Sequence, residues 1–407
     1  MRFIFVCEIV CMFYARMNGQ GADTEHFHKR IHCRSGHVTV QYKGRLIVWG
    51  GFMEHPSGYN SEYHTTDEII IYNSYTEVWS RVLTAGHIPE KNSGSCGVIV
   101  DDSLYIFGGF QENRHSWTDE VNINDLYCLN LRSLVWKKLK PTGITPLPCD
   151  KLVGWTYKQK LRGWNNQLLC YDPDLNEWSW PHTFGPTPCP RAAHAADISR
   201  NTVYIFGGRL RDERMRNLHS LNMDTMKWSG NLTSPDEPGP EGRSWHSLTF
   251  INDCWQLKLP NRTWEPVDLQ LRAEPRLWHQ AAYLPTARIL SIVGDDCWKL
   301  CTEGGVADWE EIPLAYDHGH PRFWHTAQCC APGELIIHGG QVQPFYQLHF
   351  LIQEHADSML RLNFEPKSLL RLCLNTAVEH FQETASEWST LPLPLQKILQ
   401  SRLEQVF

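Results

Sequence analysis

Two adjacent glycines recur along this chain, each time at the end of a short β-rich run. The pairs are Gly50-Gly51, Gly108-Gly109, Gly207-Gly208 and Gly339-Gly340. Strings with an arginine three residues ahead of a histidine begin at Arg34, Arg191, Arg243, Arg276 and Arg322, and weaker versions begin at Ser93 and Asp150. A unit of this size supplies too few strands to bury a core alone, so neighbouring units must pack against one another.

Each complete unit is expected to contain four strands. The second strand ends at the glycine pair, a third follows a variable loop, and the fourth contains Trp79, Trp136 or Trp228. The 17 tryptophans of the chain are spread along the sequence, which agrees with a repeat of this kind. Four strands closed by a tryptophan form one blade of a β-propeller, where blades stacked around an axis leave no exposed sheet edge.

The glycine pairs, histidine strings and tryptophans together resemble the kelch family of β-propellers. The resemblance covers residues 34–365 and implies an all-β fold. We predict an irregular N-terminal segment over residues 1–33, a kelch β-propeller over residues 34–365 and a short helical segment over residues 366–407. The seven unit starts leave a ring of six or seven blades open.

Two units are short and lack the glycine pair. The unit that starts at Asp150 runs for about 40 residues, and about 33 separate His246 from His279, against a usual kelch period of roughly 50. We therefore expect two incomplete blades, each without inner strands and with unpaired strand edges.

The charge and cysteine content exclude several classes of protein. The formal net charge is −7, with no clustered basic face, so nucleic acid is not an expected partner. The 14 cysteines form no Cys-x-x-Cys pair, and in a chain of this length they are expected to be reduced, mostly buried thiols. No metal site and no cofactor are predicted.

The N-terminal stretch Phe3–Ala15 is apolar and looks a little like a signal peptide, but Glu8 interrupts it and Arg16 stands where small residues should follow. No stretch has the apolar length of a membrane span. The sequence therefore predicts neither secretion nor membrane insertion, and we expect the protein in the nucleus and cytoplasm.

Arg209 and Arg214 follow directly on a glycine pair, where a strand has just ended. Loops at one end of a propeller converge, so binding residues come from such positions in several blades. One interpretation is a solvated surface loop. The other is an anion site, because a guanidinium group holds a carboxylate through two parallel charge-assisted hydrogen bonds.

The run from Arg191 to His246 is similar to the kelch domain-containing protein 2 family, in which the propeller is the substrate receptor of a cullin-RING ubiquitin ligase and recognises proteins ending in Gly-Gly. The resemblance implies a carboxylate pocket whose residues are Arg209, Arg214, Ser244, Trp164, Trp245 and Lys151. A further pocket tyrosine of the family falls in the block that the Asp150 unit lacks. The alternatives are that both tryptophans are core residues of blades and that Lys151 is solvated.

A helical pattern begins after Pro366. Ser368, Leu369, Cys373 and Ala377 resemble the Elongin C-binding box, and the spacing of the three apolar residues places them on one helix face. The resemblance implies that this face binds Elongin B/C. The alternative is an amphipathic helix whose apolar face packs back on the propeller.

A second helix is expected after the leucine- and proline-rich string that starts at Leu391. Leu391, Pro392, Leu395 and Leu399 resemble the box that selects cullin-2, although the Leu-Pro-x-Pro string also satisfies the cullin-5 form. The family precedent favours cullin-2 as the partner.

These resemblances imply a non-catalytic receptor subunit that binds C-terminal Gly-Gly sequences of target proteins. The second hypothesis is a kelch scaffold that binds partners through its loops and is unrelated to ubiquitin. A copper oxidase on a kelch propeller is a third, but no Tyr, His and Cys spacing in the sequence points to a copper site.

Overall fold

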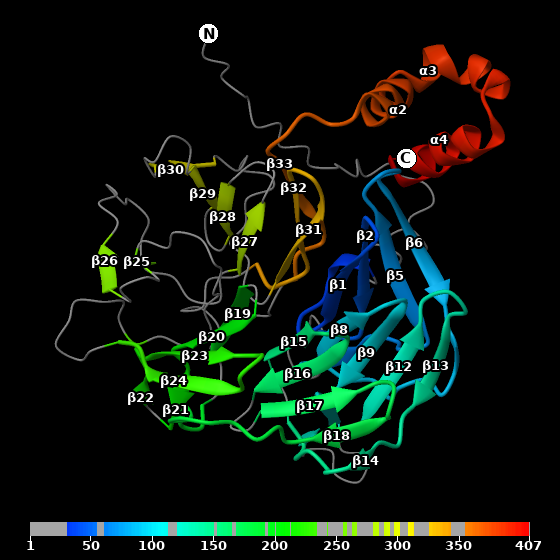
Figure 1. The fold of residues 1–407 in the computed structure, drawn as a ribbon. Helices are drawn as coiled ribbons and strands as arrows, with labels where there is room; N and C mark the ends of the chain where they lie inside the picture. The colour runs from blue at the N-terminus through cyan, green and yellow to red at the C-terminus, as the bar shows by residue number, and fades with distance from the viewer. Residues whose placement is uncertain are drawn as a thin grey trace.

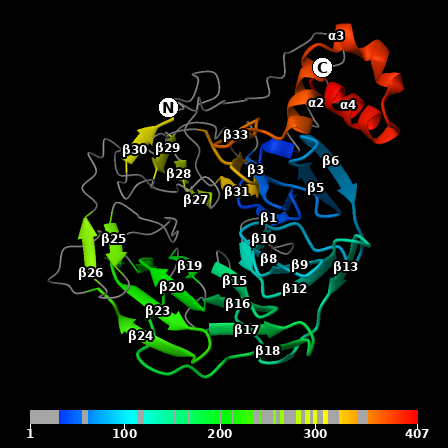
Figure 2. The same cartoon turned by 45° about the horizontal axis from the view of Figure 1, so that its top comes forward.

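The computed structural model describes residues 31–54, 61–112, 120–149, 153–164, 168–191, 194–199, 201–211, 213–233, 242, 255–258, 263–266, 280–284, 289–293, 297–301, 308–312, 325–342 and 355–406. In this part of the chain seven sheets follow one another around a ring, as Figures 1 and 2 show. Three further strand pairs are short hairpins. The β-propeller predicted from the repeat is confirmed, and seven blades are described.

The first four blades have four antiparallel strands each. Blade 1 is β1 (Val38–Tyr42), β2 (Arg45–Trp49), β5 (Glu68–Asn73) and β6 (Val78–Leu83). Blade 2 is β8 (Cys96–Val100), β9 (Ser103–Phe107), β12 (Leu126–Asn130) and β13 (Val135–Lys138). Blade 3 is β15 (Val153–Tyr157), β16 (Lys160–Trp164), β17 (Leu168–Asp172) and β18 (Glu177–Ser179). Blade 4 is β19 (Ala195–Ser199), β20 (Thr202–Phe206), β23 (Leu218–Asn222) and β24 (Lys227–Asn231).

The last three blades differ in their number of described strands. Blade 5 is the pair β25 (Trp255–Lys258) and β26 (Thr263–Pro266). Blade 6 is β27 (Gln280–Leu284), β28 (Ile289–Val293), β29 (Cys297–Cys301) and β30 (Asp308–Glu311). Blade 7 is β31 (Thr326–Ala331), β32 (Glu334–His338) and β33 (Leu360–Asn363).

The expectation of an incomplete blade after Asp150 is wrong. Blade 3 has all four strands, and only three residues separate the end of β16 from the start of β17. At this point the other early blades carry a hairpin, formed by β3 (Phe52–Glu54) with β4 (Ser61–Tyr63), β10 (Phe110–Glu112) with β11 (Glu120–Asn122), or β21 (Arg209–Leu210) with β22 (Glu213–Arg214). The short unit therefore lacks this hairpin but keeps all four strands of its blade. The described part of blade 5, by contrast, has two strands.

Apolar side chains fill the space between adjacent blades. Blades 1 and 2 share a cluster that includes Val38, Trp49, Leu104 and Trp136, all of them buried. Similar clusters join blade 2 to blade 3 and blade 3 to blade 4. The described clusters therefore form the core between successive blades from blade 1 to blade 4.

The ring closes between its first and last blades. Strand β1 contacts β8 on one side and β31 on the other. Tyr72 of blade 1 and Ile336 of blade 7 lie in one buried cluster, to which Ile31 from the start of the described chain also belongs. We call this junction of blades 1 and 7 the seam.

Connectors tie each early blade to the next. After leaving blade 1 the chain forms β7 (Ala85–Gly86), which pairs in parallel with β13 of blade 2, and β14 (Thr142–Gly143) pairs in the same way with β18 of blade 3. A bridge between Phe184 and Lys227 repeats the arrangement on blade 4. Each blade is thus extended at its outer edge by the connector from the blade before.

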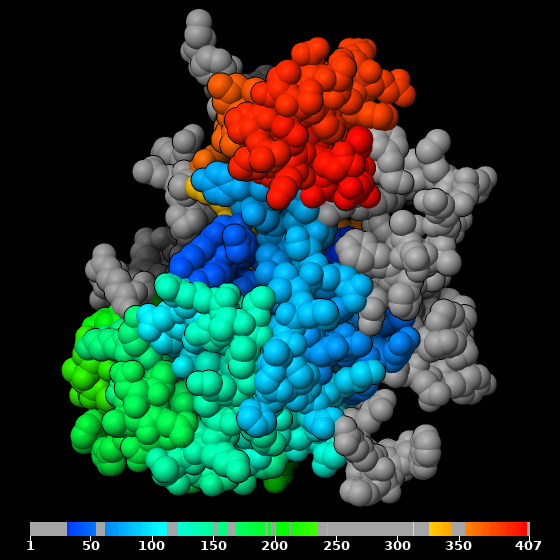
Figure 3. Space-filling model, turned by 90° about the vertical axis from the view of Figure 1, so that its right-hand side faces the viewer, coloured from blue at the N-terminus to red at the C-terminus, as the bar shows by residue number. Residues whose placement is uncertain are grey.

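The C-terminal residues form a separate group of helices, namely α2 (Leu369–Glu379), α3 (Phe381–Thr384), the 3-10 helix η3 (Ala385–Thr390) and α4 (Leu393–Val406). They lie beside the β5 and β6 end of blade 1 (Figures 1 and 3). None of the described helices is long and apolar enough to cross a membrane. The nine cysteines whose side chains the structure describes are free thiols, but the prediction that they are mostly buried is wrong for this part of the chain, because only Cys33, Cys170 and Cys330 are buried while Cys189 and Cys373 are exposed.

Candidate functional site

Arg34 and Arg191, the first residues of two of the repeat strings, bind the backbone at the glycine pairs where the second blade strands end. Arg191 is buried and its guanidinium donates to the carbonyl of Gly207 at 2.9 Å and to Asn217 Oδ1 at 2.7 Å. Arg34, also buried, donates in the same way to the carbonyl of Gly50 at 3.0 Å. These arginines therefore position the hairpins that follow the glycine pairs.

The hairpin of β21 and β22 brings two predicted site residues together. Arg209 lies directly opposite Arg214 in its register, and both side chains are exposed. Among the residues that the structure describes, neither guanidinium group has an ion-pair partner. Two adjacent cations with no carboxylate partner among the described residues offer a local site for an anion.

The backbone of Trp164 lies at the same end of the ring as this hairpin. It is the last residue of β16 and pairs with Val153, just as Phe206 ends β20 and pairs with Ala195 before the hairpin begins. Trp164 thus occupies a register position equivalent to that of Phe206, although its side chain is outside the described part. Lys151, Ser244 and Trp245 also lie outside the described residues.

Helix α2 exposes the face that the sequence assigned to a partner. Ser368 is its N-cap and accepts a hydrogen bond from the Arg371 amide at 3.4 Å. Leu369 is 77% exposed and Cys373 is also exposed, whereas Ala377 is half-buried against the apolar cluster of the helices. The face with Leu369 and Cys373 does not pack back on the propeller, which removes the alternative interpretation for these two residues.

Of the four residues predicted to bind a cullin, some are exposed and others are buried among the helices. Pro392 is exposed just ahead of α4, and Leu391 and Leu395 are partly buried in the helical cluster. Leu399 is only 1% exposed, so in this structure it holds the helices together and offers no surface to a partner.

The sequence interpretation missed two exposed leucines next to these residues. Leu370 is 48% exposed on α2 and Leu393 is 68% exposed at the start of α4. No signal in the spacing indicated the exposure of Leu370, because Leu370 lies four residues before Leu374 on the same face as the buried Leu374 and Val378.

The described part of the chain contains no group of three or more His, Cys, Asp or Glu side chains that could hold a metal ion. Several histidines are instead buried without a carboxylate nearby. Burial lowers the pKa of His194 to about 4, and the charge of Arg191 acts in the same direction. These histidines are neutral parts of the blades.

The ring of blades with glycine pairs followed by hairpins defines a kelch-repeat propeller, a protein-interaction module. The family model of the KLHDC2/KLHL20/DRC7 Kelch-repeats domain matches residues 36–253. Kelch domain-containing protein 2 of Bos taurus is 33% identical over 398 residues, which cover 88% of each chain. Kelch domain-containing protein 1 of Homo sapiens is 31% identical over 415 residues, covering 92% of this chain and 90% of that protein. The chain belongs to the kelch-repeat family that contains these two proteins.

Proposed function

We propose that this chain is the substrate-recognition subunit of a cullin-RING ubiquitin ligase and that its propeller binds proteins ending in Gly-Gly. The observation that carries the proposal is the exposed pair Arg209 and Arg214, which face each other without an ion-pair partner among the described residues. A C-terminal carboxylate is an anion that paired guanidinium groups bind through parallel charge-assisted hydrogen bonds. The transfer of ubiquitin belongs to other subunits, so the chain itself is not an enzyme.

The remaining pocket residues complete the recognition of a chain end. In the proposal the Ser244 hydroxyl donates to the carboxylate, Trp164 and Trp245 form walls that leave room only for glycine, and Lys151 adds a further cation. The family's tyrosine has no counterpart, because the link from β16 to β17 is only three residues long. We therefore expect the same ligand class as in the family, bound with lower affinity.

The helical segment is the proposed docking site for the other subunits. An exposed apolar helix face with Leu369 and Cys373 fits the groove of an adaptor such as Elongin B/C. Pro392 and Leu391 at the start of α4 are the accessible part of the cullin-2 site, with cullin-5 as the other partner to test. Such a ligase would work in the nucleus and cytoplasm.

Binding of a labelled peptide that ends in Gly-Gly, followed by fluorescence polarisation, tests the propeller. We expect binding that requires the free terminal carboxylate and is reduced at least about 100-fold by Arg209→Ala or Arg214→Ala, since a charge-assisted bond contributes roughly 1.5–3 kcal/mol and the pair acts together. Arg45→Ala is the matched control, because Arg45 is exposed at the opposite end of blade 1. Equal binding of the amidated peptide would contradict the proposal.

Co-purification with Elongin B/C and with cullin-2 or cullin-5 tests the helical segment. The double variant Leu369→Ala, Cys373→Ala should lose the adaptor, while Leu175→Ala, which changes a leucine 66% exposed on the propeller, should keep it. Capture of Gly-Gly peptides without any adaptor would favour a kelch scaffold unrelated to ubiquitin.

A further inference from the structure

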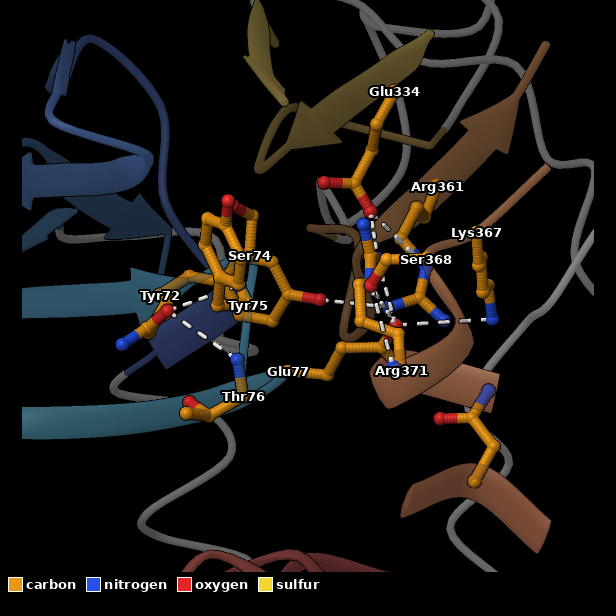
Figure 4. A network of polar contacts seen from close by, with 12 residues as sticks. Tyr72, Ser74, Tyr75, Thr76, Glu77, Glu334, Arg361, Lys367, Ser368 and Arg371 are labelled. Carbon is orange, nitrogen blue, oxygen red and sulfur yellow. Dashed lines mark hydrogen bonds and ion pairs between the residues drawn. The ribbon is translucent and has the colours of Figure 1, made fainter. Parts of the chain in front are cut away.

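Five charged side chains meet where the seam contacts the helical segment (Figure 4). Glu77 comes from the turn between β5 and β6 of blade 1, and Glu334 and Arg361 come from β32 and β33 of blade 7. Arg371 comes from α2 and Lys367 from the residues just before it. We call this group the seam network. Its side chains are between 1% and 8% exposed, so all of them are buried.

The distances show a connected network. Arg361 contacts Glu77 at 2.8 Å and also donates to the Tyr72 hydroxyl at 2.8 Å. Arg371 donates to Glu77 at 2.7 Å and to Glu334 at 2.5 Å, and Lys367 lies 3.8 Å from Glu77. Arg371 is therefore the one described side chain of the helices that bonds to carboxylates of both the first and the last blade.

The charged side chains of the seam network stabilise one another's charges. Burial alone would raise the pKa of Glu77, but the charges of Arg361, Lys367 and Arg371 outweigh it and lower that pKa. Glu77 and Glu334 carry two negative charges, and Arg361 supplies only one positive charge from the blades. The helical segment supplies two more cations, Arg371 and Lys367, to carboxylates that would be strongly destabilising if they were buried without a partner.

Arg402 of α4 makes a second polar contact with the same part of blade 1. Its guanidinium donates to the backbone carbonyl of Thr76, beside Glu77, and at 2.6 Å to Asn375 Oδ1 of α2. Arg371 and Arg402 thus hold two helices against a single turn of the propeller.

The buried apolar cluster of the helical segment is internal. Its buried cluster consists of residues of the segment alone, among them Leu374, Val378, Trp388 and Leu399. The segment therefore has its own core, and the seam network and Arg402 bond it to the propeller. Charge-assisted hydrogen bonds require defined directions, so they fix an orientation more narrowly than apolar contact does.

We propose that the seam network is an orienting latch, in which Arg371, supported by Arg402, sets the angle of the helical segment on the propeller and thereby the direction in which the exposed face of α2 is presented. Arg371 is a positioning residue, since it lies on the side of α2 away from Leu369 and contacts no exposed partner surface. The latch itself does not depend on the proposed function; only the identity of the partner that binds α2 does.

Distances between two spin labels on the full-length chain test the latch without any partner. Noncanonical amino acids that carry the labels replace Lys137 of blade 2 and Lys397 of α4, which are both exposed. We expect one narrow distance distribution for the wild-type chain and a broad one, with longer distances, for Arg371→Met. Arg371→Lys should restore a narrower distribution, and Arg402→Met should broaden it while the tryptophan fluorescence of the blades stays unchanged.

Arg132→Met is the control, because Arg132 pairs with Asp102 on blade 2, away from the seam network. If Arg371→Met does not fold, the double variant Glu77→Gln, Arg371→Gln is measured instead, because it removes one charge of each sign. The latch is overturned if the distance distribution stays narrow in Arg402→Met and also in Arg371→Met or, where that variant does not fold, in the double variant. If a variant loses adaptor binding while its distance distribution stays narrow, the result bears on the proposed function and not on the latch.

Discussion

A methyl group at Gly143 should displace the connector strand β14 from the outer edge of blade 3. Gly143 lies in the connector strand β14 with φ of 82°, and a Cβ built on it would meet the backbone carbonyl oxygen of Trp178 at 2.2 Å. Real Cβ atoms do not approach backbone so closely, and Trp178 cannot retreat, because it closes blade 3 and is buried. The Gly143→Ala substitution therefore pushes the connector away from β18.

The cost has two parts. The left-handed backbone at Gly143 costs an alanine about 1 kcal/mol. Moving the connector also weakens the bonds that flank it, from the Thr142 amide to the Asn176 carbonyl at 2.9 Å and from the Ile144 amide to the Trp178 carbonyl at 3.1 Å, each contributing about 1 kcal/mol. We expect a total loss of about 3 kcal/mol in the free energy of unfolding.

Gly230→Ala is the matched control. Gly230 has a similar φ of 76°, but its nearest neighbour would be a side-chain atom of Pro186 at 3.6 Å, an ordinary contact. It should cost only the backbone part, about 1 kcal/mol. Urea unfolding followed by tryptophan fluorescence compares the two variants, and equal midpoints would refute the role assigned to the connector glycine.

Three further predictions concern the blades. Arg191→Ala should lower the free energy of unfolding by about 2 kcal/mol and weaken peptide binding, because the carbonyl of Gly207 loses its donor; thermal melts and the polarisation assay check both. Trp136→Ala removes a fully buried ring between blades 1 and 2 and should cost about 3–5 kcal/mol, measured by urea unfolding. Burial lowers the pKa of His194, His219 and His355 to about 4, so the unfolded chain takes up protons that the folded chain refuses. Stability should be full above about pH 6.5 and fall toward pH 4, and urea midpoints that do not decrease from pH 7 to pH 5 would contradict this.

The regular part of the fold could be predicted because its signals are local. Trp79, Trp136 and Trp228 lie in the outer strands β6, β13 and β24, as their place in the repeat indicated. Gly50 and Gly51 both have positive φ, a conformation that favours glycine. The helix after Pro366 also formed as expected, since its spacing and its N-cap are contained in a dozen residues.

The error over blade 3 came from equating the length of a unit with its number of strands. The hairpin after the glycine pair is an addition to the blade, so its loss shortens the repeat and leaves the sheet whole. A usable signal was overlooked as well. Gly86, Gly143 and Gly185 are each followed by a proline three residues later, and all three lie in connectors.

The seam network could not be predicted, because charged residues are ordinarily solvated and no sequence pattern links a glutamate of blade 1 to an arginine of α2. Of the pocket, the sequence placed Arg209 and Arg214 together after one glycine pair, and the structure shows that they lie opposite each other in a hairpin. The burial of Leu399 was also hidden, because the docking box and the core of the helices use the same apolar spacing.

Glu77 and Arg371 are 294 residues apart in the sequence, which has a consequence for biosynthesis. At ordinary translation rates of roughly 5–20 residues per second, about 15–60 s pass between the synthesis of the two. During that time blade 1 is complete, yet one of its flanks carries a carboxylate and apolar side chains such as Tyr72 that await blade 7 and α2. A nascent chain in this state offers a chaperone a defined surface, and a ribosome that stalls before the C-terminal helices leaves Glu77 and Glu334 without Arg371.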